Sequence, residues 1–158
     1  MQATPIITLE AAERLLNTLE SFLDEAEANF ALIIDRGGAV LSQAGRVADS
    51  IDPTIVGALA AGSFAATKEL AARIGEVEFT ALHQQGQTSQ ILMCAVDSEV
   101  VMVTIFDDKT TLGLVKFYST RTVKRIATVL SDLRGSQAAI EPAFSPADVD
   151  QATKVFEQ

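Results

Sequence analysis

Near the start of the chain, apolar residues recur at helical spacing, with glutamate and aspartate between them. This pattern predicts an amphipathic helix over residues 8–28 with one buried face. The buried face holds Ala12, Leu15, Leu16, Leu19, Phe22, Leu23 and Ala26. Two β-type runs follow at residues 30–35 and 39–44. They flank Gly37 and Gly38, which predicts a β-hairpin.

The next predicted element is a helix over residues 53–74, with small or apolar residues on every side. Asp52 suits its N-cap, Pro53 its first turn, and Gly75 its end. The stripe expected to face the core consists of Ile55, Leu59, Ala66, Leu70 and Ile74. No charged residue occurs between residues 55 and 66. Such a helix needs cover on more than one side, so we expect other chains to supply part of it.

The second half of the chain contains three more β-type runs and a last long helix. The runs cover residues 88–96, 100–106 and 112–118, and short polar turns between them predict antiparallel neighbours. Residues 76–87 form an extended stretch without a firm assignment. The last helix repeats Val123, Ile126, Ala127, Leu130 and Leu133 at helical spacing and is expected to stop before Gly135.

The expected order is therefore helix, two strands, helix, three strands and helix, in one α+β domain over residues 1–134. Residues 135–158 are interpreted as a linker and a short C-terminal amphipathic helix, because Ser145 to Asp148 form a capping box. The apolar side of this helix consists of Val149, Ala152, Val155 and Phe156. It either docks on its own domain or binds a partner.

Composition restricts the class of protein. The chain has 158 residues, of which 48% are hydrophobic, and its formal net charge is -9. An acidic surface disfavours wide contact with nucleic acid or anionic lipid, both of which require a basic footprint. The uncharged, apolar run of residues 53–67 is too short to cross a bilayer. With one cysteine, Cys94, and no secretion signal, we expect a cytoplasmic protein without membrane insertion.

Candidate catalytic chemistry is sparse. The single histidine, His83, and the single Cys94 do not assemble a metal site or a nucleophile with its base. Gly57, Gly62 and Ser63 imitate part of a phosphate-binding loop, but its lysine is missing and the segment lies inside a predicted helix. We therefore expect no active site, no metal and no cofactor.

Several strings, in this order along the chain, resemble a known family. They are residues 31–38 (ALIIDRGG), 60–67 (AAGSFAAT), 74–76 (IGE), 106–108 (FDD) and 112–116 (LGLVK). Together with the order of elements, they are similar to the Roadblock, or dynein light-chain, domain family. Within that family they are most like the MglB group, bacterial proteins paired with the Ras-like GTPase MglA. The resemblance covers nearly the whole chain and includes its acidic, partly apolar end.

The resemblance implies a Roadblock fold, in which a five-stranded antiparallel sheet carries helices. It also implies that two copies join their sheets and second helices into a homodimer. Such a dimer would bind a GTP-bound Ras-like (MglA-type) GTPase and accelerate hydrolysis by reordering the GTPase's own catalytic residues. Arg121 and Arg125 would then be surface charges remote from the phosphates. Cell polarity and motility are the processes served in this family.

Carried over by position, the family's contacts fall on the second helix. The GTPase-binding residues would be Ala58, Ala61, Gly62, Ala65 and Glu69, and Glu69 places a charge where the family has a small residue. Gly57, Ala60, Phe64 and Ala71, opposite the expected core stripe, would form the dimer interface.

Three other hypotheses stay open at this stage. An arginine finger needs only an exposed arginine within reach of the nucleotide. A Roadblock scaffold or adaptor would bind a GTPase or another partner without changing its turnover. An enzyme acting on a small molecule would need a closed pocket with convergent polar groups, and the sequence offers no candidate set.

Overall fold

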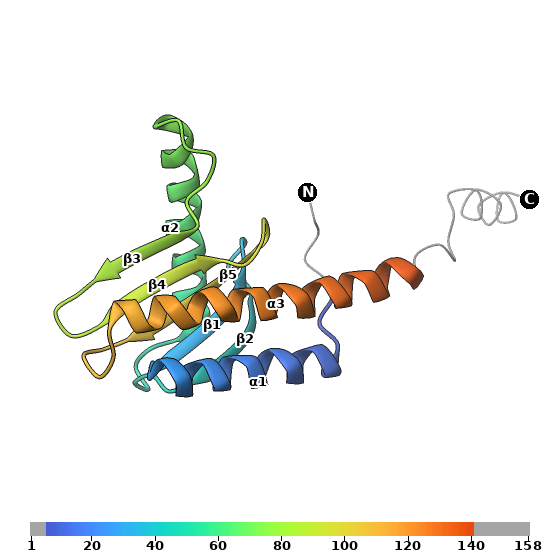
Figure 1. Cartoon of the computed structure of the whole chain (residues 1–158), viewed down its shortest axis with the longest axis horizontal. Helices are drawn as coiled ribbons and strands as arrows, with labels where there is room; N and C mark the ends of the chain where they lie inside the picture. Colours follow the sequence, from blue (N-terminus) through green and yellow to red (C-terminus); the bar gives the residue numbers. More distant parts are fainter. Residues whose placement is uncertain (1–5, 141–158) are drawn as a thin grey trace, which may run out of the picture.

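The computed structural model describes residues 6–140, which form three helices and five strands around one central sheet (Figure 1). The elements follow the expected order α-β-β-α-β-β-β-α. Helices α1 (Leu9–Ala26) and α3 (Leu112–Ile140) lie side by side on one face of the sheet. Helix α2 (Pro53–Arg73) packs on the other face. The predicted fold class is therefore confirmed.

All neighbouring strands of the sheet are antiparallel, in the spatial order β2-β1-β5-β4-β3. The central strands β1 (Phe30–Asp35) and β5 (Val100–Phe106) are nearly all buried, because both faces of the sheet are covered there. Strand β4 (Gln90–Ala95) lies next to β5. The edges are β2 (Val40–Gly45) and β3 (Ala81–Gln85), each paired on one side only.

The layer of α1 and α3 covers the larger of two apolar cores. Thr8 caps α1 by accepting a hydrogen bond from the backbone N–H of Ala11, and Glu27 ends it in a left-handed conformation with a φ of 55°. The two helices run antiparallel, and an ion pair of 3.3 Å between Arg14 Nη2 and Asp132 Oδ2 joins them on the outside. Between them and the sheet lie Leu15, Leu19, Phe22, Met102, Phe106, Ile126 and Leu130.

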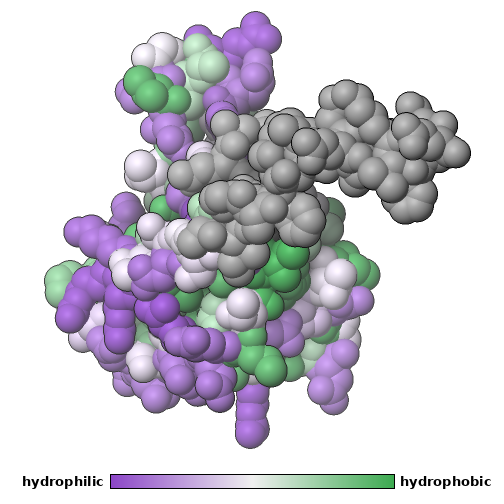
Figure 2. Space-filling model, turned by 90° about the vertical axis from the view of Figure 1, so that its right-hand side faces the viewer, coloured by the Kyte–Doolittle hydropathy of each residue, from purple (hydrophilic) through white to green (hydrophobic). Residues whose placement is uncertain are grey.

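Helix α2 approaches the sheet closely at its beginning and then leaves it. Asp52 caps the helix through the Thr54 N–H, and Pro53 lies in the first turn, as predicted. A Cβ added to Gly38, in the β1–β2 turn, would lie 2.7 Å from the Cα of Ala58. Gly57 faces the same turn, so glycine on both sides permits the contact. The C-terminal part of α2 stands clear of the body (Figures 1 and 2).

Three predicted boundaries are wrong. Residues 112–118 begin α3 instead of forming a strand, because the Thr111 hydroxyl accepts a hydrogen bond from the Leu114 N–H and caps the helix. The helix also passes through Gly135, where an added Cβ would meet nothing within 4 Å, and ends at Ile140. Three strands do follow α2, as expected, but the first of them is β3, which lies within residues 76–87 that the sequence left without an assignment.

The buried face of α2 is also the opposite of the predicted one. The sequence analysis assigned five residues to the core, and all of them are exposed: Ile55, Leu59, Ala66, Leu70 and Ile74. The buried residues are instead Gly57, Ala60, Ala61, Phe64 and Ala71. The steric reason is the close approach at Gly38, which admits only small side chains on the inner face of the first turns.

Replacing Gly38 with alanine tests the importance of this approach. Gly38 has a φ of +93° and its new Cβ would clash with backbone, so we expect Gly38→Ala to lower the free energy of unfolding by about 2 kcal/mol or more. Urea unfolding followed by circular dichroism measures the change.

The matched control is Gly62→Ala, at a helical position with nothing within 4 Å of the added Cβ. It should stabilise the protein by about 0.5–1 kcal/mol, because alanine is the better helix former. Equal effects from the two substitutions would contradict the assigned role of Gly38.

Candidate interaction surface

The outer face of α2, with its C-cap, carries four of the ten large apolar side chains that are exposed among the described residues. Ile55, Leu59, Leu70 and Ile74 are 57%, 68%, 55% and 62% exposed. By length and composition alone α2 could cross a membrane, with a mean hydropathy of 1.2 over 18 residues and 28% of that window buried. Core helices of soluble proteins meet the same criterion. Its inner face packs on the sheet, so the exposed residues form a surface, which we call the α2 outer face.

Four of the five predicted GTPase-binding residues lie on this outer face. Ala58, Gly62, Ala65 and Glu69 are exposed, and they follow one edge of the stripe formed by the large apolar residues. Glu69 Oε1 forms an ion pair of 3.2 Å with Arg73 Nε, so the charge lies at the far end of the face. Ala61 is only 6% exposed and packs in the core between α2 and the sheet, so it is not available to a partner.

The residues predicted for the dimer interface are used by the chain itself. Ala60 and Phe64 belong to the core under α2, and Gly57 faces the β1–β2 turn. Ala71 is fully buried near the end of the helix, where the Glu76 N–H donates to the Ala71 carbonyl. A contact between two copies would therefore use the exposed residues of α2 in place of these four.

The sheet beside α2 is also incompletely covered. Leu82, Ile91 and Ile105 point to the α2 side and are only partly buried, although their core neighbours Leu32 and Val103 are fully enclosed. Leu82 belongs to β3, whose outer edge has no partner strand within the described residues. The incompletely covered sheet therefore continues the apolar surface from α2 to an open strand edge.

An ionic network that the sequence analysis missed holds the elements around this surface. The Arg36 guanidinium lies 5.5 Å from the centre of the Phe64 ring, and its Nη2 is 3.5 Å from Glu78 Oε1. The same Nη2 donates to the Asp97 carbonyl. Asp97 Oδ2 also accepts a hydrogen bond of 2.9 Å from Arg134 on α3. Nothing in the spacing of these residues along the chain signals their proximity.

The other candidate residues have structural surroundings. Burial raises the pKa of the Cys94 thiol. The hydrogen bond with Ser119 and the charge of Lys116 lower this pKa, but by less, so the thiol stays protonated at neutral pH. His83 Nε2 lies 2.8 Å from Gln90 Oε1, and its ring stacks on Phe106. Residues 6–140 contain no group of histidine, cysteine, aspartate and glutamate side chains placed to hold a metal ion.

Asp107 is the other titratable group with a clear shift. Hydrogen bonds from the Lys109 N–H, and secondarily from the Asn29 amide, hold the pKa of its carboxyl below the ordinary value. This carboxylate connects the end of β5 to the end of α1. It therefore orders a turn and is not poised to exchange protons at neutral pH.

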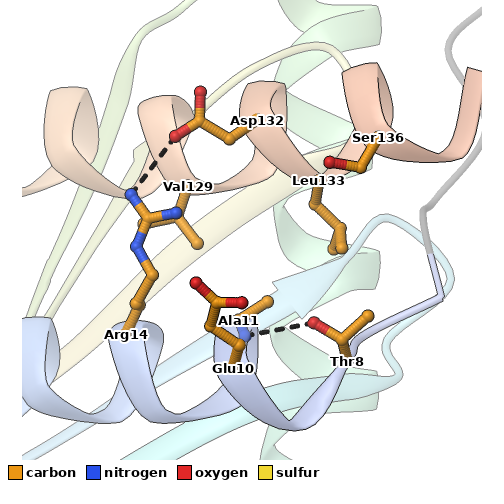
Figure 3. A pocket seen from close by; sticks show the side chains of 8 residues that line it. All are labelled: Thr8, Glu10, Ala11, Arg14, Val129, Asp132, Leu133 and Ser136. Carbon is orange, nitrogen blue, oxygen red and sulfur yellow. Dashed lines mark hydrogen bonds and ion pairs between the residues drawn. The ribbon is translucent and has the colours of Figure 1, made fainter. Parts of the chain in front are cut away.

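A groove of about 380 Å³ lies between the N-terminal half of α1 and the C-terminal half of α3 (Figure 3). The Arg14 and Asp132 side chains meet across one end of it, and Glu10 and Thr8 line the α1 side. It is an open seam between helices, and its polar groups do not converge on one point as those of a catalytic site do. The predicted partner-binding helix with Val149, Ala152, Val155 and Phe156 lies outside the described residues.

Comparison with known proteins agrees with this geometry. The sequence profile of the Roadblock/LC7 domain matches residues 14–106, which is more than half of the chain. The chain therefore belongs to the Roadblock/LC7 domain family. A search of curated protein sequences finds no match.

Within this family, the solved structures of MglB proteins are similar over most of the chain. MglB from Myxococcus xanthus is 30% identical, over 81% of this chain and 96% of that one, with a TM-score of 0.75. The gliding protein MglB from Thermus thermophilus is 28% identical, over 84% and 99%, with a TM-score of 0.76. A structure described as MglB with a tetrameric arrangement is 27% identical over the same shares, with a TM-score of 0.78.

The protonated state of Cys94 makes a chemical prediction. We expect the folded protein to react with a thiol reagent at neutral pH at least about tenfold more slowly than the protein in denaturant, because the thiolate is the reactive form. The rate of colour release from Ellman's reagent measures both reactions. Equal rates would mean that Cys94 is accessible and ionised.

Proposed function

We propose that this protein is a homodimeric regulator that binds the GTP-bound form of a small Ras-like GTPase and accelerates its hydrolysis of GTP. The observation that supports it is the exposed, largely apolar outer face of α2, which carries no charge between residues 55 and 66, on a fold similar to MglB over most of the chain. MglB proteins are paired with the Ras-like GTPase MglA, so an MglA-type partner is the corresponding proposal here.

Burial of the α2 outer face favours the dimer. Four large apolar side chains of this face are in contact with water: Ile55, Leu59, Leu70 and Ile74. Full burial of each one would stabilise a contact by about 1.5–3 kcal/mol. Two α2 helices packed against each other would remove these side chains from water. The incompletely covered sheet and the open edge of β3 adjoin the same surface, so a second copy could cover them as well.

The small residues at the edge of α2 suit a second partner. Ala58, Gly62 and Ala65 would let a GTPase approach the helix backbone closely, whereas the large residues of the adjoining stripe are better suited to the contact between copies. The two partners would therefore share one helix and use neighbouring faces of it. Glu69, already paired with Arg73, would lie at the border of the contact.

The arrangement favours activation without an arginine supplied by α3. Arg121 and Arg125 lie on α3, across the sheet from the α2 outer face, and could not reach a nucleotide bound on the α2 side. The regulator would instead order the GTPase's own catalytic residues. This role needs no active site of its own and places the protein in the cytoplasm, in a process such as cell polarity or motility.

Leu59→Asp tests the dimer. We expect wild-type protein to show by light scattering a mass of at least twice the 16.8 kDa of one chain. The buried charge of the variant should halve the measured mass, because an unpaired carboxylate in an apolar contact costs several kcal/mol. The control is Leu9→Asp, at a leucine that is 88% exposed on α1, across the sheet from α2, and it should not lower the mass. A wild-type monomer at micromolar concentration would exclude the dimer.

Single-turnover GTP hydrolysis by a Ras-like GTPase of the same organism tests the activity. A twofold excess of this protein should accelerate hydrolysis by about an order of magnitude or more. Ala65→Arg should abolish the acceleration, because the long side chain fills the space needed for close approach, whereas Ala138→Arg, at an exposed position of α3, should leave it intact. Binding without acceleration would favour a scaffold or adaptor, and normal activation by Ala65→Arg would show that the contact lies elsewhere.

A further inference from the structure

The outer surface of the α1 and α3 layer separates charges of opposite sign. The exposed side of α1 is acidic, and its carboxylates are Glu10, Glu13, Glu20, Asp24 and Glu25. Between residues 109 and 131 there is no acidic residue, and the exposed basic residues of α3 there are Lys116, Arg121, Lys124 and Arg125. A basic surface of this extent is unexpected on a chain whose net charge is -9.

The carboxylates in the second half of α1 are level with Arg121 and Lys124 of α3, yet they form no ion pair with them. The ion pair of Arg14 and Asp132 sets the register of the antiparallel helices, and the groove beside it repeats that register (Figure 3). Counting one residue for one along both helices puts Arg121 and Lys124 level with residues 20–25. Within residues 6–140, the only ion pair between α1 and α3 is Arg14 with Asp132. Arg125 lines a second groove between the two helices, beside Arg14 and Asn17, and the other charges named above are exposed.

An exposed aromatic residue lies within the basic surface. Phe117 is 59% exposed, and the Arg121 guanidinium carbon lies 6.0 Å from the centre of its ring. Guanidinium held over an aromatic ring is typical of interface residues, because it presents flat apolar area together with charge. The surface thus offers both charge and an apolar anchor to a partner.

We propose that this layer binds the same layer of a second copy of the chain, with α3 of each copy on α1 of the other. A two-fold axis that lies between the two copies and parallel to the helices would produce this contact. Rotation about such an axis preserves height along the helices, so Arg121 and Lys124 of one copy would face residues 20–25 of the other. The complementary contact occurs twice, as a two-fold interface requires.

Charge complementarity identifies a second copy as the occupant. The partner must present an acidic helix beside a basic one at matching height, and this chain carries that arrangement itself. A partner that is acidic throughout, or an anionic membrane, would attract the basic residues of α3. It would also repel the carboxylates of α1, because the two helices lie side by side.

The available area indicates a weak contact that depends on salt. The 18 residues of α1 span about 27 Å, and two helices are roughly 20 Å wide together. The contact would therefore bury roughly 500 Å² of surface on each copy, which is at the lower end of the areas that specific interfaces bury. The contact lies across the sheet from α2, so it would double whatever assembly α2 forms.

Sedimentation velocity of the full chain at about 50 mM and about 0.5 M salt tests the contact. We expect the mass of the wild-type assembly to halve at high salt. Two double variants should have half the wild-type mass at low salt. One carries Arg121→Glu and Lys124→Glu on α3, and the other carries Glu20→Lys and Asp24→Lys on α1. All four positions are exposed, so circular dichroism should show unchanged folding.

Mixing the two variants is the decisive measurement. Each variant alone opposes like charges, whereas a mixed pair opposes unlike charges at both contacts, so the equimolar mixture should recover the wild-type mass. Variants that keep the wild-type mass, or a mixture that stays at half the mass, would overturn the proposal. So would binding of wild-type protein to vesicles containing anionic lipid together with an unchanged mass.

The result is separable from that for the α2 dimer. Leu59→Asp acts on the opposite side of the sheet and should still lose half its remaining mass at high salt. If α2 does not associate, wild-type protein should fall from dimer to monomer with salt, and the mixing result should be the same.

Discussion

The fit of the small-residue face of α2 against the β1–β2 turn decides which surfaces of this protein remain exposed. Gly38 and Gly57 let the helix backbone approach the turn to a distance that a single added Cβ would prevent. Because this contact takes the small side of the helix, the large apolar side faces away from the sheet. The exposed stripe of Ile55, Leu59, Leu70 and Ile74 is thus a consequence of packing on the opposite side.

The ionic network around Arg36 and Asp97 lies at the same end of the sheet, because Arg36 belongs to the same β1–β2 turn as Gly38. It connects the segment after α2, the β4–β5 turn and the C-terminal half of α3, which are far apart along the chain. Asp97 and Arg134 are mostly buried and paired, and removal of either partner would leave a charge without compensation. The network therefore positions α3 relative to the sheet.

The two sides of the sheet present surfaces of different physical character. The α2 side is apolar and suits a stable contact whose energy comes from the removal of side chains from water. The side with α1 and α3 is charged, and a contact there would be sensitive to salt and to exact register. A protein with both surfaces can combine a permanent association with an adjustable one, and the sheet keeps the two independent.

The sequence by itself determined the order of elements, the N-cap of α2 and the absence of charge over residues 55–66 of that helix. Asp52, Pro53 and Thr8 act through local hydrogen bonds and backbone angles, which depend on neighbouring residues alone. The resemblance of short strings to Roadblock proteins added the family. Of the residues proposed to contact a GTPase, Ala58, Gly62 and Ala65 are exposed on α2, as such a contact requires.

Only the tertiary structure decided which face of α2 is buried. Both faces lack charge between residues 55 and 66, so hydropathy carries no direction, and steric fit at Gly38 makes the choice. Likewise β3 contains His83, Gln84 and Gln85 and becomes a strand because β4 pairs with it. The β-type residues 112–118 become helical because a cap and core contacts outweigh their weak strand preference. In each case, long-range contacts override a local signal that was ambiguous or weak.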